Sequence, residues 1–123
     1  MTTATSSSRV LRIVGAFAAV GGAVLWLAFF VEHVTAWFIG PPWPPPEVWI
    51  ALFAHLAIFV GLVASLRWRL AGSVATIVST IFFFAMTVWP PVPVLFIPAI
   101  APALIFLAAW ALGRHADAQR LRA

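Results

Sequence analysis

The chain has 123 residues, of which 64% are hydrophobic and 8% are charged, and its mean hydropathy is +1.10. Soluble domains are about 45–50% apolar and about 25% charged, so this chain carries too little polar surface to cover a water-facing exterior. These values exclude most soluble enzymes, nucleic-acid binders and disordered regulators. We therefore expect a small integral membrane protein.

The net charge of +4 and the isoelectric point near 11.9 come from seven arginines, because the sequence contains no lysine. The arginines form three short clusters at the edges of apolar runs: Arg9 and Arg12, then Arg67 and Arg69, then Arg114, Arg120 and Arg122. Such clusters are typical of topology signals and of contacts with anionic lipid headgroups. We expect membrane lipids as partners and no nucleic acid. The absence of cysteine excludes disulfides and thiolate chemistry.

The first apolar run covers about residues 12–39 and is interrupted only by Glu32 and His33 after its start. A secretory signal has an apolar region of only about 7–15 residues, so we expect a retained membrane helix. At 1.5 Å per residue its length is about 40 Å, which exceeds the ~30 Å hydrocarbon core of a bilayer. The helix must therefore tilt or protrude on one side.

Three further apolar runs follow in chain order, over about 48–66, 70–88 and 94–112. The proline-rich segment 40–47 cannot be helical, and the segment 89–93 breaks the third helix, so these two segments form two of the three junctions. The tripeptide 67–69 turns the chain at the remaining junction, and Gly113 is placed to end the fourth helix. Each run approaches the ~20 residues that a spanning helix needs, and none shows the alternation of barrel strands.

The expected fold is one domain over 1–123, an all-α membrane protein with four transmembrane helices in an antiparallel bundle. All seven arginines lie at the N-terminus, in the second connection or in the C-terminal tail. The positive-inside rule makes these three segments cytoplasmic, so both termini are expected in the cytoplasm and the protein in the inner (cytoplasmic) membrane. Tryptophans mark the two interfaces, with Trp37, Trp43, Trp49 and Trp89 outside and Trp68 and Trp110 inside.

Small residues recur along the first three spans and predict the interior contacts, because helices in lipid associate through close packing of small side chains. The stripes are Gly15, Ala18 and Gly22, then Ala54, Ala57, Gly61 and Ala64, then Gly72, Ala75 and Ser79. In the fourth span, Pro98 and Pro102 each remove a backbone donor, which predicts a kink.

Glu32, His33 and His55 are the ionisable residues inside the apolar spans, where such groups are costly and commonly functional. His33 lies about 9 Å from the end of the first span, and His55 lies about 10 Å from the start of the second. The two spans are expected to be neighbours, because a short connection joins them. Both histidines should therefore lie at similar depth in the outer leaflet.

Equal depth leaves three interpretations open. The two histidines bracket a haem iron, or each binds a metal or a chlorophyll-type magnesium. Alternatively, Glu32 and His55 form a proton-relay pair. In the third interpretation, the three groups hydrogen-bond one another and hold the first two helices together.

Helical phase separates the two histidines. His33 is five full turns from Gly15, so it shares the small-residue face and should point into the bundle. His55 lies roughly 140° from the centre of the Ala54–Ala64 stripe, at about 100° per residue. We therefore expect His55 to point away from the bundle, toward lipid, a partner protein or a bound cofactor.

Two local patterns resemble known membrane proteins. The spacing from Ala51 to His55 resembles that of bacterial light-harvesting polypeptides, in which the histidine binds bacteriochlorophyll. Glu32 in the first of four short spans resembles the glutamate of the small multidrug-resistance transporters. These resemblances imply pigment binding through His55 and proton coupling through Glu32.

A third resemblance covers nearly the whole chain. Its motifs are Arg9-x-x-Arg12-Ile13, Glu32-His33, His55-Leu56, Arg67-Trp68 followed by Ala71-Gly72, and the segment from Pro98 to Trp110. Together they resemble a group of small uncharacterised four-helix bacterial membrane proteins. That resemblance implies the fold and the topology but no mechanism, since the group has no assigned activity.

The sequence favours a non-enzymatic accessory or scaffold subunit of a larger inner-membrane complex, which self-associates or joins other membrane subunits. The first alternative is a haem- or chlorophyll-binding subunit that uses His33 and His55. The second is a small proton-coupled transporter that uses Glu32. No nucleophile–base pair, phosphate loop or metalloprotease motif in the sequence indicates an enzyme.

Overall fold

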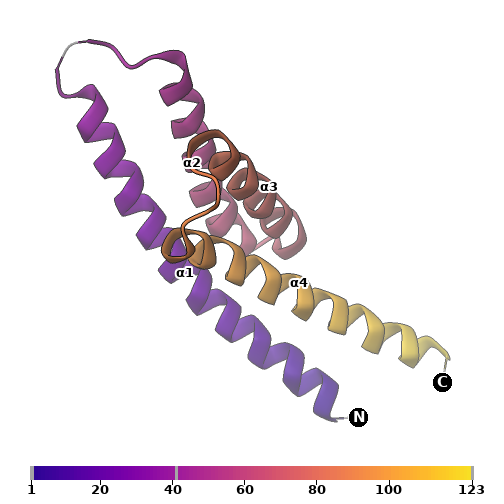
Figure 1. Cartoon of the computed structure of the whole chain (residues 1–123). Coiled ribbons are helices and arrows are strands. Elements are labelled where there is room, and N and C mark those ends of the chain that lie inside the picture. Colours follow the sequence, from indigo (N-terminus) through magenta and orange to yellow (C-terminus); the bar gives the residue numbers. More distant parts are fainter. Residues whose placement is uncertain (1, 41, 123) are drawn as a thin grey trace.

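The computed structural model describes residues 2–40 and 42–122, and this part of the chain is all-helical. Its helices are α1 (Thr2–Phe38), α2 (Pro46–Ser65), α3 (Arg69–Thr87) and α4 (Pro93–Arg122) (Figure 1). All four are long and apolar enough to cross a membrane. The expected four spans are thus confirmed as helices, and the chain has the character of a multi-pass membrane protein.

α1 and α4 extend well beyond their apolar runs. α1 begins at Thr2 rather than near residue 12, and α4 continues to Arg122. Their 37 and 30 residues correspond to lengths of about 55 and about 45 Å. The prediction that Gly113 ends the fourth helix is wrong. Alanine and arginine make up most of the tail after Gly113, and these good helix formers continue the backbone hydrogen bonding after the apolar run has ended.

The helices pack mainly in two pairs, α1 with α4 and α2 with α3. Gly15 lies against Phe106, and Gly22 lies against Pro98. Residue numbers therefore increase along α1 in the direction in which they decrease along α4. Figure 1 shows the two chain ends together at one end of the molecule. α1 also contacts α2, and α3 contacts α4, so the two pairs enclose a shared core. The core residues are Ala23, Trp26, Ala54, Ile58, Leu62, Phe83, Phe84 and Ala99.

One close contact between α1 and α4 involves a carbonyl that proline has freed. Pro102 has no backbone N–H and cannot donate to the carbonyl of Pro98 four residues earlier. That carbonyl oxygen lies against Gly22, where an added Cβ would overlap it. The hydrogens on the Gly22 Cα are therefore the groups that face the freed oxygen, in a weak contact of the kind that recurs at helix interfaces.

The α2–α3 interface is closed by small and hydroxyl-bearing residues. Gly72 lies against the backbone of Ser65, with no room for a side chain at position 72. Thr76 and Thr80 are buried, and each hydroxyl donates to the carbonyl four residues earlier, at 2.8 and 2.6 Å. Ala75, which the predicted stripe placed inside, is exposed. The threonines occupy the interior positions because their hydroxyls are satisfied within their own helix and their short side chains allow close approach.

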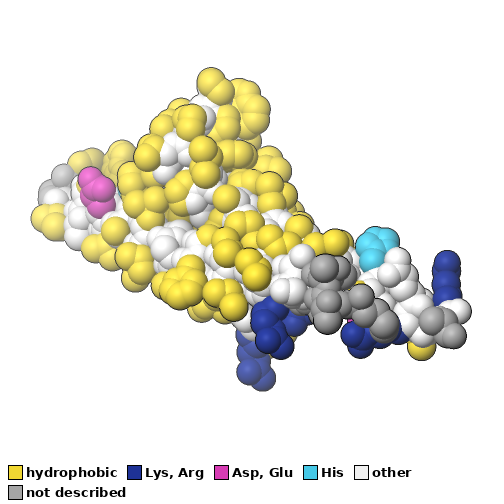
Figure 2. Space-filling model, turned by 90° about the horizontal axis from the view of Figure 1, so that it is seen from below, with side chains coloured by type: hydrophobic (Ala, Val, Ile, Leu, Met, Phe, Trp, Pro, Cys, Tyr) yellow, Lys and Arg dark blue, Asp and Glu magenta, His cyan; other side chains and the backbone are white. Residues whose placement is uncertain are grey.

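Apolar side chains are exposed along all four helices, as a lipid-facing surface requires and a water-facing one does not tolerate. Figure 2 shows hydrophobic side chains over most of one face and arginines gathered at one end. Of the seven tryptophans, six are exposed and Trp26 is 1% exposed. Trp26 is therefore an interior residue, whereas the others have the exposure expected of interfacial tryptophans.

The adjacent glycines of α1 provide a matched test of the α1–α4 contact. We expect Gly22→Ala to destabilise the protein by about 1–3 kcal/mol, because the new methyl group must displace the Pro98 backbone. Gly21→Ala is the control, since no described atom lies within 4 Å of a Cβ at position 21. It should be neutral or slightly stabilising, because alanine is the better helix former. Thermal unfolding in detergent, followed by circular dichroism, measures both, and equal melting temperatures would contradict the close contact.

Candidate functional site

A cavity of about 380 Å³ lies between the helices at the end of the molecule that carries the α1–α2 connection. Its inner wall includes the buried side chains of Trp26, His55 and Phe84. Its rim includes Trp37 and Glu47, which are exposed. An apolar, aromatic lining with a few polar groups is typical of small-molecule sites, so this cavity is the candidate functional site.

His55 lies in the inner wall and is 1% exposed. Its Nε2–H donates to the backbone carbonyl of Trp26, on the neighbouring helix α1, at 2.9 Å. The imidazole also meets the Trp26 indole edge to face, with ring centroids 4.7 Å apart, and lies 5.4 Å from the Phe83 ring. The side chain is thus fixed in direction by one hydrogen bond and two aromatic neighbours.

The expectation that His55 points away from the bundle is wrong. The buried residues of α2 are Leu52, Ala54, His55, Ile58, Gly61, Leu62 and Ser65. Ala57, a member of the predicted small-residue stripe, is exposed. The interior face of α2 includes the large residues Ile58 and Leu62 as well as small ones. The predicted stripe contained small residues only, so it placed the centre of the interior face too far from His55. His55 therefore needs no neighbouring protein to cover it.

His33 lies on α1 and is partly buried. Its Nδ1–H donates to the carbonyl of Phe29, one turn earlier, at 2.9 Å. Its ring meets the His55 ring edge to face, with centroids 5.6 Å apart. Both rings line the cavity. The structure thus brings the two histidines together, as their expected depths suggested, and turns His33 inward as its helical phase predicts.

Two polar atoms in the inner wall are buried and have no hydrogen-bond partner among the described residues. They are Nδ1 of His55 and Nε1 of Trp26. Nε2 of His55 carries the proton, because it faces a carbonyl that can only accept, so in the neutral ring Nδ1 is an acceptor. Indole Nε1–H is a donor. One unpaired donor and one unpaired acceptor therefore lie on touching rings, although buried groups of this kind cost about 1–3 kcal/mol each when unpaired.

The histidine geometry bears on which cofactor would fit. The two imidazoles are in edge-to-face contact, which leaves no layer between them for a porphyrin plane. Within the described residues, no group of three or more His, Cys, Asp or Glu side chains is placed to hold a metal ion. The two imidazoles therefore stand in direct contact on the cavity wall, each with one ring nitrogen already hydrogen-bonded to a backbone carbonyl.

Glu32 is exposed and is not among the cavity-lining residues. It precedes His33 by one residue, a rotation of about 100° around the helix, which turns it away from the cavity wall. The carboxylate at the rim comes instead from Glu47, in the first turn of α2. The structure therefore brings together His33 and His55 but not Glu32.

Trp26 is the cavity residue that the sequence analysis passed over. Its signal is its position, because it stands in the middle of a span whereas the other six tryptophans stand near span ends. A tryptophan at that depth has an N–H that must find a partner away from the interfaces. That requirement distinguishes it from the residues of an aromatic belt.

No family model, curated protein or solved structure matches this chain. This is consistent with the resemblance to a group of proteins without assigned activity.

A pair of substitutions separates a binding role for His55 from a structural one. We expect His55→Leu to change the free energy of unfolding by less than about 1 kcal/mol. The lost interhelical hydrogen bond, about 0.6 kcal/mol on average in membranes, is offset by removal of an unpaired buried acceptor. Trp26→Ala should cost about 3–5 kcal/mol, because it empties the centre of the core. Unfolding in mixed micelles measures both, and a His55→Leu loss as large as that of Trp26→Ala would make His55 a structural residue.

Proposed function

We propose that this chain is a non-enzymatic membrane subunit that binds an apolar, hydroxyl-bearing molecule in the cavity between its helices. The observation that carries the proposal is the pair of unpaired buried atoms, His55 Nδ1 and Trp26 Nε1, on touching rings of the cavity wall. A hydroxyl group donates one hydrogen bond and accepts others. A single hydroxyl that reached both atoms would therefore supply both missing partners.

The cavity lining defines the rest of the ligand. Phe29, Phe83 and Phe84 line the cavity together with aliphatic side chains, so the body of the ligand is apolar or aromatic. In the neutral His33 ring, Nδ1 donates to Phe29 and Nε2 is a second acceptor. A lipid-soluble molecule with two hydroxyl groups, such as a quinol, fits this pattern of acceptors.

The membrane arrangement is part of the same proposal. We propose an antiparallel bundle with both termini in the cytoplasm of a bacterial cell, and with the histidine cavity toward the outer leaflet. The distribution of arginines supports this orientation, since every one lies near the chain ends or in the α2–α3 connection. The cavity lies at the opposite end, beside the α1–α2 connection.

The geometry of the cavity gives less support to the other functions expected from the sequence. A scaffold role loses one of its grounds, because His55 is covered within the chain. A haem or chlorophyll requires the imidazoles to separate or requires binding to one of them alone. A transport role through Glu32 requires a path that does not pass through this cavity, whose lining excludes that residue. Hydroxyl recognition uses the imidazole and indole rings that line the cavity, and it requires the wall to open slightly at the two buried atoms.

An alkyl-substituted benzoquinol and the matching benzoquinone test the proposal, because they differ in their hydroxyl hydrogens. The quinol donates to the imidazole acceptors, whereas the quinone can only accept. We expect the quinol to bind more tightly, by about 2–10-fold for each hydrogen bond gained. Isothermal titration calorimetry on the detergent-solubilised protein measures both affinities.

Substitutions then assign the preference to the cavity. His55→Leu and His33→Phe should each lower the quinol affinity toward that of the quinone. Glu32→Gln is the control and should leave both affinities unchanged, because Glu32 does not line the cavity. The absence of quinol binding, or an equal affinity for the two probes that neither histidine substitution alters, would reject the proposal.

A further inference from the structure

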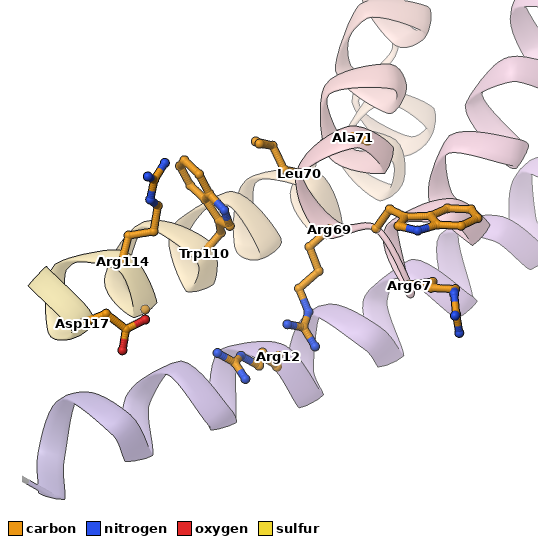
Figure 3. A pocket seen from close by; sticks show the side chains of 10 residues that line it. Arg12, Arg67, Arg69, Leu70, Ala71, Trp110, Arg114 and Asp117 are labelled. Atoms are coloured by element: carbon orange, nitrogen blue, oxygen red, sulfur yellow. The ribbon is translucent and has the colours of Figure 1, made fainter.

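A second hollow, of about 560 Å³, lies where α1, the α2–α3 turn and α4 meet at the arginine-rich end of the molecule. It shares no lining residue with the histidine cavity. Its charged lining consists of Arg12, Arg67, Arg69, Arg114 and Asp117 (Figure 3). Four guanidinium groups against one carboxylate leave three net positive charges around this arginine pocket.

Two of the arginines approach each other from different helices. The Arg12 guanidinium reaches from α1 across to α4, where its Nη2 would lie 3.7 Å from a Cβ at Gly113. Figure 3 shows the Arg69 side chain extending from the start of α3 toward α1 and Arg12. Like charges repel, and more strongly beside a low-dielectric bilayer than in water. An anion between the two guanidinium groups converts this repulsion into two attractive contacts.

Tryptophans place the arginine pocket at the level of lipid headgroups. The Arg67 guanidinium lies 5.9 Å from the centroid of the Trp68 ring, and that of Arg114 lies 5.0 Å from the Trp110 ring. Both tryptophans are exposed and line the pocket, and exposed tryptophans favour the membrane interface. Leu70 and Ala71 continue the lining from the charged groups onto the apolar surface of α3. The pocket therefore joins a charged head region to a surface that suits acyl chains.

We propose that the arginine pocket binds the headgroup of a phospholipid with two phosphodiester groups, as in cardiolipin. The planar guanidinium fork matches phosphate oxygens in pairs, and basic pockets between membrane helices on the cytoplasmic side suit such headgroups. One phosphodiester lies between Arg12 and Arg69. The second uses one of the flanking arginines, Arg67 or Arg114, which lie on opposite sides of the Arg12–Arg69 pair (Figure 3), so that two of the three excess charges are neutralised. The lipid thereby links the α1–α4 pair to the α2–α3 pair.

The test uses the full chain in detergent and three probes: cardiolipin, phosphatidylglycerol and inorganic pyrophosphate. Native mass spectrometry counts bound lipid, and thermal unfolding reports stabilisation by each probe. We expect one cardiolipin to be retained and to raise the melting temperature. Phosphatidylglycerol, with one phosphodiester, should bind about tenfold or more weakly. Pyrophosphate should stabilise the protein much less than cardiolipin and should not displace cardiolipin at equal concentration, because it lacks acyl chains.

Matched double substitutions locate the binding. R12Q/R69Q removes two charges from the pocket and should lower cardiolipin affinity by about tenfold or more. R120Q/R122Q removes the same number from exposed positions of α4 outside the pocket lining and should retain the lipid. Circular dichroism checks the helix content of both, and R12K/R69K, which keeps the charge without the fork, should bind with intermediate affinity.

Each contrary result overturns a stated part of the proposal. Equal loss of lipid from R12Q/R69Q and R120Q/R122Q would show general attraction to the basic end of the protein rather than a pocket. Equal affinity for phosphatidylglycerol would reject the requirement for two phosphodiester groups. Displacement of cardiolipin by pyrophosphate would assign the pocket to a free anion. If the quinol experiment fails, each of these lipid-binding results can still be interpreted, because the two sites share no residue.

Discussion

The packing of Trp26 against residues of the other three helices holds together the region where the helices of this bundle meet. Helices in lipid gain little from the hydrophobic effect, so their association depends on packing and on interhelical hydrogen bonds. The Trp26 carbonyl accepts such a bond from α2, and its indole lies 5.4 and 6.3 Å from the Phe83 and Phe84 rings of α3. Ala99 of α4 completes the same cluster. The Trp26 side chain of α1 thereby reaches α3, although the backbones of α1 and α3 make no close approach within the described residues.

The sequence predicts the spans well because hydropathy reports the lipid-facing surface directly. It predicts the inward direction of His33 because Gly15 and Gly22 define the interior face of α1, and both are buried. It fails for His55 because the interior of α2 also takes Ile58 and Leu62, whose apolar side chains suit lipid equally well. In a membrane helix, a large apolar residue carries no information about direction. The inner face is then known only once the neighbouring helix is placed.

The ends of the helices show a related limit. Hydropathy locates the edges of the apolar runs, but the backbone ladder of α1 and α4 does not stop there. The arginine pocket depends on this extension, since Asp117 and Arg114 follow the glycine that was expected to end α4. The clustering of arginines along the chain is visible in the sequence. Their convergence from three separate segments is visible only in the fold.

The uneven pairing of the helices also constrains how the chain assembles. α2 and α3 are joined by three residues and pack against each other, so their association requires little loop closure. The main neighbour of α1 is α4, and contacts such as Gly22 with Pro98 must wait until the rest of the chain has been synthesised. Contacts so distant in sequence form slowly. Of these four helices, α1 is thus made before the others but reaches its main neighbour late, and until then its glycine face lies open to lipid.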